Sequence, residues 1–149
     1  MPSSLAISKS VALLASGLFT GAALYVSFVE HPARIQCGTR LAVTEFAPSY
    51  KRGAIMQASL STIGTLAAIA AWLQGAPPSW LIGGLLLGSL IPFTLIVILP
   101  TNKRLLDPAL DKDSALAEQL LQRWGKLHAA RTALSLPSFL VFLSAAIRW

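Results

Sequence analysis

Charged side chains are scarce in this sequence. Asp, Glu, Lys and Arg make up 12% of its 149 residues, about half the share that a soluble globular domain carries. Hydrophobic residues make up 54%, so the chain has too few polar groups to cover a surface in water. The shortage of charge excludes a soluble domain and indicates a membrane protein.

Cysteine is also scarce. The single Cys37 forms neither an internal disulfide nor a Cys-x-x-Cys redox pair. This excludes the thiol-driven quinone reductases, another class of small four-helix membrane enzymes. The sequence also lacks a glycine-rich nucleotide loop, a P-loop and a serine nucleophile elbow, so it shows no motif for nucleotide or serine-hydrolase chemistry.

Long apolar runs are present instead, at residues 11–29, 54–73, 80–99 and 129–147. A helix of about 20 residues crosses a hydrocarbon core of roughly 30 Å, and lipid requires the internal hydrogen bonds of a helix. The alternative interpretation of the first run is a cleaved signal peptide. The run is, however, longer than the apolar core of a normal signal peptide. The sequence predicts one all-α domain over residues 1–149, an integral membrane four-helix bundle with spans near 7–30, 53–74, 79–99 and 114–147.

Cations are distributed unevenly between the two ends of this bundle. The net charge of +6 would suggest a nucleic-acid partner in a soluble protein, but here it reflects membrane topology. Nine lysines and arginines fall in the two long loops, and two, including Arg148, lie near the termini. The positive-inside rule therefore places both loops in the cytoplasm and both termini outside. Trp72, Trp80 and Trp149 are expected at the outer interface.

The ends of two spans are predicted from local patterns. Pro32 disfavours helix at the residue before it, so the first helix is expected to end near Glu30. Apolar residues spaced three or four apart begin near residue 114, well before the last apolar run. The last helix is therefore expected to extend from the membrane into the cytoplasm.

Polar residues are predicted to gather at the cytoplasmic end of the bundle. Ionisable groups near hydrocarbon are costly and indicate function, and these are Glu30, His31, Asn102, Lys103, Arg104, His128 and Arg131. Structural roles are the alternatives: a solvated Glu30 or its ion pair with Arg131 or Arg104, an exposed loop His31, cationic anchors at Lys103 and Arg104, a helix cap by Asn102, and a structural hydrogen bond by His128.

Two kinds of ligand are compatible with these residues. Trp124, His128 and Arg131 lie three or four apart on one helix face and suit a flat aromatic ligand with oxygen substituents, although a tryptophan there also suits core packing. Glu30, His31 and His128 are the residue types of a two-His-one-carboxylate metal site. No two of them have the i, i+3 or i+4 spacing of helical ligand pairs, so no resident metal is expected.

Three motifs resemble a known family. "EHPAR" after the first span, "PTNKRL" after the third and "WGKLHAAR" at the start of the fourth are similar to the anthrone-oxygenase-like family of small four-helix membrane proteins. The resemblance covers nearly the whole chain and is most specific in "PTNKRL" and the downstream W-x-x-x-H-x-x-R pattern. It implies oxidation of an anthrone-like polycyclic phenol to a quinone by dioxygen, with neither flavin nor haem evident.

For this chemistry we assign roles to particular residues as a hypothesis. His128 is expected to be the base that forms a substrate carbanion, with Glu30 orienting it or raising its basicity. Asn102 and Arg131 are expected to donate hydrogen bonds to the oxyanion, with Arg104 as a second candidate donor. The expected substrate-binding residues are Trp124, Arg104, Thr101, His31 and Tyr25.

The expected partners are a small aromatic substrate and the lipid bilayer, without nucleic acid; a homo-oligomer is compatible with the sequence. The expected location is the plasma membrane in a bacterium, or the endoplasmic reticulum or another endomembrane in a fungus. A non-catalytic small-molecule binder and a structural or assembly protein are the alternative functions.

Overall fold

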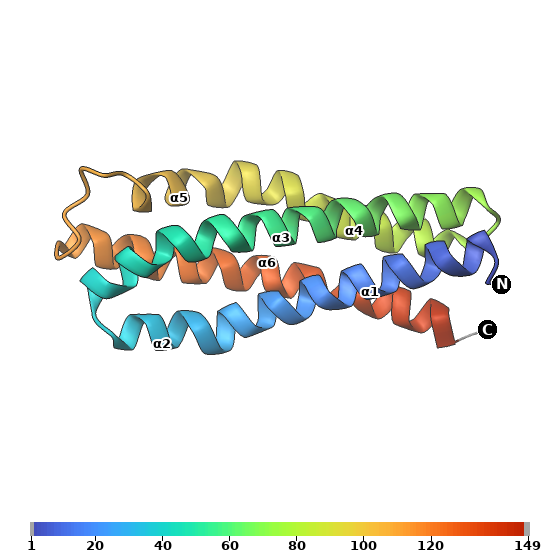
Figure 1. The fold of residues 1–149 in the computed structure, drawn as a ribbon, viewed down its shortest axis with the longest axis horizontal. Coiled ribbons are helices and arrows are strands. Elements are labelled where there is room, and N and C mark those ends of the chain that lie inside the picture. The colour runs from blue at the N-terminus through green and yellow to red at the C-terminus, as the bar shows by residue number, and fades with distance from the viewer. Residues whose placement is uncertain (1, 148–149) are drawn as a thin grey trace.

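Four long helices make up most of residues 2–147, the part of the chain that the computed structural model describes (Figure 1). We call them spans 1 to 4, and each is long and apolar enough to cross a membrane: Ser4–Gln36, Thr39–Leu73, Pro78–Leu105 and Ala115–Ile147. The prediction of an all-α bundle of four membrane-spanning helices is confirmed for these residues. Arg148 and Trp149, which entered the predicted topology, lie outside the described residues.

Tight turns reverse the chain after span 1 and after span 2. Gly38 and Gly75 have φ angles of 90° and 95°, a left-handed conformation that residues with a Cβ rarely adopt. Gly38 lies between spans 1 and 2, and Gly75 follows span 2. As a result, both termini lie at one end of the bundle, and the span 1–2 turn and the span 3–4 loop lie at the other (Figure 1). We call this other end the loop end.

Span 1 continues past Pro32, so the prediction that its helix ends near Glu30 is wrong. Its parts are α1 (Ser4–Tyr25), the π-helical turn η1 (Val26–Glu30) and α2 (His31–Gln36). At the end of η1 the His31 N–H bonds to the carbonyl of Val26, five residues back. This wider turn makes room for the proline, which has no N–H and whose ring clashes with the normal α-helical carbonyl.

Span 3 has the same arrangement before Pro100. It consists of α4 (Pro78–Phe93), the π-helical turn η2 (Thr94–Ile98) and α5 (Leu99–Leu105). The Leu99 N–H bonds to the carbonyl of Thr94, again five residues back. The motif "PTNKRL" therefore lies within a helix that extends beyond the apolar run.

Spans 2 and 4 are single α-helices, α3 (Thr39–Leu73) and α6 (Ala115–Ile147). The start of α3 lies well before the predicted 53–74, so most of the segment interpreted as the first cytoplasmic loop is helical, even with Pro48 inside it. Helix formation there brings additional side chains from α3 to the interior of the loop end.

The interior of the bundle contains two apolar clusters, one near each end. Toward the termini, Trp80 packs against Phe142 with ring centroids 5.4 Å apart. Toward the loop end, Phe46 meets Trp124 edge-on at 5.3 Å. Residues of both clusters line the candidate site.

Candidate functional site

A cavity of about 200 Å³ lies inside the bundle, with walls from all four spans. Phe19 and Leu90 of one apolar cluster and Phe46, Ile98 and Trp124 of the other line it. An apolar cavity of ~150 Å³ holds a benzene ring, so this cavity is large enough for an aromatic group. Both π-helical turns contribute lining residues, and such turns are frequent at functional sites.

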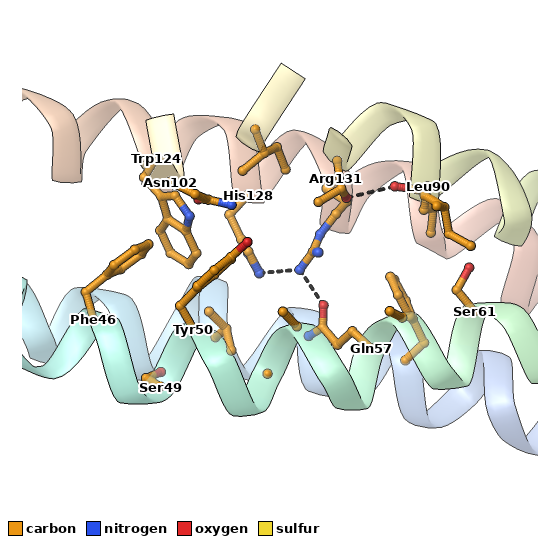
Figure 2. A pocket seen from close by; sticks show the side chains of 18 of the residues that line it. Phe46, Ser49, Tyr50, Gln57, Ser61, Leu90, Asn102, Trp124, His128 and Arg131 are labelled. Carbon is orange, nitrogen blue, oxygen red and sulfur yellow. Dashed lines mark hydrogen bonds between the residues drawn. The ribbon is translucent and has the colours of Figure 1, made fainter. Parts of the chain in front are cut away.

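His128 lies in the cavity wall, and polar partners hold both of its ring nitrogens. Arg131 Nη2 donates to Nε2 at 2.7 Å (Figure 2). On the other side of the ring, Nδ1 lies 3.0 Å from Ser27 Oγ. Ser27 Oγ is in turn 2.9 Å from the hydroxyl of Thr132, which also donates to the His128 carbonyl at 2.9 Å. Span 1 and span 4 together fix the imidazole.

These contacts define which nitrogen of His128 carries the proton. An arginine is only a donor, so Nε2 accepts from Arg131 and the proton of the neutral ring is on Nδ1. Nδ1–H then donates to Ser27, whose hydroxyl donates to Thr132. When Arg131 binds another acceptor, the lone pair on Nε2 is free to take a proton.

Arg131 brings to the cavity a positive charge that forms no ion pair within residues 2–147. It also donates to the side-chain carbonyl of Gln57 on α3 (Figure 2), and its guanidinium carbon lies 5.6 Å from the centre of the Phe19 ring. The ion pairs found among residues 2–147 involve Arg34 and Arg40. A cation with neutral partners in a cavity of low dielectric constant favours a bound anion.

Trp124 lies between the two histidines of the chain. Its ring centroid is 4.7 Å from that of His128 and 5.0 Å from that of His31. Gly125 makes this arrangement feasible, because a Cβ at that position would lie 2.5 Å from His31 Nε2. His31 therefore supports the tryptophan from behind and does not itself line the cavity.

Glu30 has different partners from those predicted. Its carboxylate accepts from Arg34 and, at 2.7 Å, from the Ser49 hydroxyl, and Arg34 also pairs with Glu45 on α3. Glu30 lines the cavity, but its described hydrogen bonds reach neither His128 nor the other arginines proposed as partners. Ser27 and Arg131 orient His128 instead.

Four polar atoms on lining side chains are buried without a hydrogen-bond partner in the described part of the chain. Arg34 Nε is paired with Glu45 in an ion pair, which leaves Asn102 Oδ1, Trp124 Nε1 and Arg131 Nε. Native proteins satisfy most buried polar groups, so these atoms indicate a ligand with both donors and acceptors. Asn102 is 1% exposed and lies inside α5, whose C-cap is Leu106. It is therefore not the helix cap that was considered from the sequence.

Besides His31, three more of the predicted substrate-binding residues do not line this cavity. Thr101 is buried within α5, Arg104 is exposed on the same helix, and Tyr25 is 56% exposed at the end of α1. The alternative metal site is not assembled either. Within residues 2–147, no group of three His, Cys, Asp or Glu side chains is arranged to hold a metal, so Glu30, His31 and His128 do not form one.

Several cavity residues were not identified from the sequence. Gln57 had a visible signal, since it is a buried amide inside an apolar run, and Arg34 is part of the "EHPAR" motif. Ser49 and Tyr50 belong to the segment interpreted as a loop, so no pattern predicted their position. Figure 2 shows Tyr50 extending from α3 toward His128 and Arg131.

Comparison with known proteins identifies the family. The family described as anthrone oxygenase matches residues 46–141, which is more than half of the chain. The matched region contains "PTNKRL" and "WGKLHAAR", whereas "EHPAR" precedes it. No curated protein and no solved structure matches the chain. The match over the segments that carry Asn102, Trp124, His128 and Arg131 means that this chain belongs to the anthrone oxygenase family.

Proposed function

We propose that this protein is a membrane oxygenase that converts an anthrone-like polycyclic phenol to a quinone with dioxygen. The observation that carries the proposal is the pair formed by His128 and Arg131. A neutral imidazole with an acceptor nitrogen lies 2.7 Å from a cation that has no carboxylate partner among residues 2–147. The pair is part of a cavity lined mainly by apolar side chains. A base beside an anion-stabilising group suits removal of a proton from carbon.

The first step would be loss of a proton from the benzylic methylene of the anthrone. The resulting anion is delocalised into an aromatic phenolate, so this C–H is unusually acidic. The ligand's carbonyl oxygen would accept from the guanidinium of Arg131, which releases Nε2 of His128 to take the proton. Negative charge then develops on an oxygen close to Arg131, where a low dielectric constant strengthens the attraction.

The following steps use the reducing power of the substrate. The carbanion gives one electron to dioxygen, and the carbon radical and superoxide combine to a peroxide. Protonated His128 returns its proton to the terminal peroxide oxygen. Loss of the second methylene proton with cleavage of the O–O bond then gives the quinone carbonyl and water. Anthrone and dioxygen thus balance quinone and water without an external reductant, and we propose that no resident cofactor or metal takes part.

Other lining residues would hold the substrate for this reaction. The Asn102 amide and the Trp124 indole N–H have buried atoms without partners in the described part of the chain, and they suit the hydroxyl and carbonyl groups of a polycyclic phenol. The face of the Trp124 ring suits its fused rings. The lipid-embedded cavity suits an apolar substrate and an apolar gas. We place it near the cytoplasmic side of a bacterial plasma membrane or of a fungal endomembrane.

Dioxygen uptake tests this function. Protein in lipid nanodiscs would receive emodin anthrone, while an oxygen electrode and the quinone absorbance are followed together. His128→Ala and chelator-treated protein would be measured in parallel, and the spontaneous oxidation of the anthrone subtracted. The proposal predicts uptake of one dioxygen per quinone, a rate lower by about 10²–10⁴-fold in the variant, and no effect of the chelator.

A different result would contradict each component of the proposal. A wild-type rate equal to the spontaneous rate would remove the anthrone as substrate. An active His128→Ala protein would remove the base, and loss of activity on chelation would show that a metal takes part. Emodin binding without turnover would favour the alternative of a non-catalytic small-molecule binder.

A further inference from the structure

The cavity has exposed lining residues on two facing elements. Ala58 on α3 and Leu95 on η2 are exposed although both line the cavity, and Leu95 is 57% exposed. Gly53 and Ala54, one turn earlier on α3, also line it and are half-buried. A Cβ at Gly53 would meet no atom within 4 Å. The side of the cavity between α3 and η2 is therefore bordered on α3 by small side chains.

The backbone separates at the same place. Farther toward the termini α3 and α4 pack tightly, because α4 has glycines there: a Cβ at Gly84 would lie 2.7 Å from the Cβ of Ala68, and one at Gly88 3.1 Å from the Thr65 side chain. Past α4 this packing ends, and α3 makes almost no close backbone approach to η2. The π-helical turn η2 thus begins where the close packing of α3 and α4 ends.

The surroundings of this opening are apolar. Exposed large side chains flank it on both elements, including Ile55 at 70% on α3 and Ile96 at 73% on η2. In a helix that crosses a membrane, such side chains face hydrocarbon. The loop-end side of the cavity differs, because Arg34 lines it there and pairs with Glu30 and Glu45, with only 4% of its side chain exposed.

We propose that the ligand enters the cavity sideways from the lipid, through a portal between α3 and η2. The portal consists of Gly53, Ala54, Ala58 and Leu95. The small residues on α3 admit a flat polycyclic molecule, and their size sets the largest ligand that reaches His128. An apolar substrate dissolved in the bilayer then reaches the cavity without crossing the ion pairs at the loop end.

Ligand association rates test the portal independently of turnover. Emodin, a stable tricyclic quinone, would be mixed with protein in lipid nanodiscs, and its binding followed as quenching of tryptophan fluorescence, since Trp124 lines the cavity. Ala58→Phe is expected to slow association at least tenfold and Leu95→Ala to accelerate it. Ser59→Phe is the matched control, because Ser59 is exposed beside Ala58 but does not line the cavity, and its rate is expected to equal that of the wild type.

The results separate the portal from the proposed reaction. Emodin binding at the wild-type rate by both folded portal variants would overturn the portal, whether or not the protein oxidises anthrones. Equal slowing by Ala58→Phe and Ser59→Phe would also overturn it, as would a wild-type protein that binds no emodin. Slow association by Ala58→Phe and fast association by Leu95→Ala would support the portal even if no anthrone were oxidised. Thermal unfolding of each variant identifies any that fails to fold.

Discussion

His128 and Arg131 are predicted to act as one catalytic unit, so that loss of both is little worse than loss of either. In the structure Arg131 donates to His128 Nε2 at 2.7 Å, and in the proposed reaction it stabilises the anion that His128 creates. Without the base, this anion does not form at a useful rate, and Arg131 has no charge to stabilise. The relevant variants are His128→Ala, Arg131→Met and the double variant.

The expected magnitudes distinguish a unit from two independent residues. A positioned general base contributes about 10²–10⁴-fold to the rate, and one donor to an oxyanion contributes about 10²–10³-fold in kcat. Independent effects would multiply to a loss of about 10⁴–10⁷-fold. For residues that act together, we expect the double variant to remain within about tenfold of the worse single variant.

The assay is the kcat for emodin anthrone in lipid nanodiscs, corrected for spontaneous oxidation. Circular dichroism and thermal unfolding show whether each variant has kept its fold, because removal of Arg131 also leaves Gln57 and the imidazole without a donor. Multiplicative losses among folded variants would refute the coupling and with it the proposed division of labour.

Three further substitutions test contacts around the site. Ser27→Ala removes the acceptor of the His128 Nδ1–H, which is worth about 1 kcal/mol. The kcat is therefore expected to fall by about fivefold and Ser27→Thr to restore it; an unchanged kcat would contradict the assigned tautomer. Gly125→Ala places a Cβ 2.5 Å from His31 Nε2 and is expected to destabilise the fold by about 1–3 kcal/mol in thermal unfolding, whereas an unchanged Tm would argue against this packing. Glu30→Gln breaks an ion pair whose carboxylate side chain is 28% exposed, so we expect a loss of about 1 kcal/mol in stability and near-normal kcat; a loss as large as that of His128→Ala would indicate that Glu30 acts on the base.

The fold was largely predictable because hydrocarbon imposes a simple requirement. Four apolar runs of sufficient length become helices, since no other local structure satisfies their backbone in lipid. The helix continuing past Pro32 was not predictable in this way, because the usual rule ends a helix before proline. The π-helical turn η1 removes the clash, and no simple sequence pattern marks such a turn. The N-terminal part of α3 contains Pro48, and the same rule about proline did not predict a helix there.

The cavity was partly predictable, because an ionisable group in a membrane helix has few inexpensive positions. Trp124, His128 and Arg131 share a helix face, and all three line the cavity as this spacing indicated. Asn102 also lines it. The partners that orient His128 were not predictable, since Ser27 lies 101 residues away in sequence and only the packing of span 1 on span 4 brings it near. Tertiary packing, which spacing along one helix does not encode, determines these contacts.

Chemical rescue tests the central claim most directly, namely that the imidazole of His128 is the base for oxidation in this cavity. His128→Ala leaves a space of the size of the ring it removes, beside Arg131. Imidazole added to this variant would be titrated while emodin formation and dioxygen uptake are recorded, with Arg131→Met as the control. The account predicts that imidazole restores turnover in a saturable manner to His128→Ala but not to Arg131→Met. Full activity of His128→Ala without imidazole, or equal stimulation of both variants and of the spontaneous reaction, would contradict it.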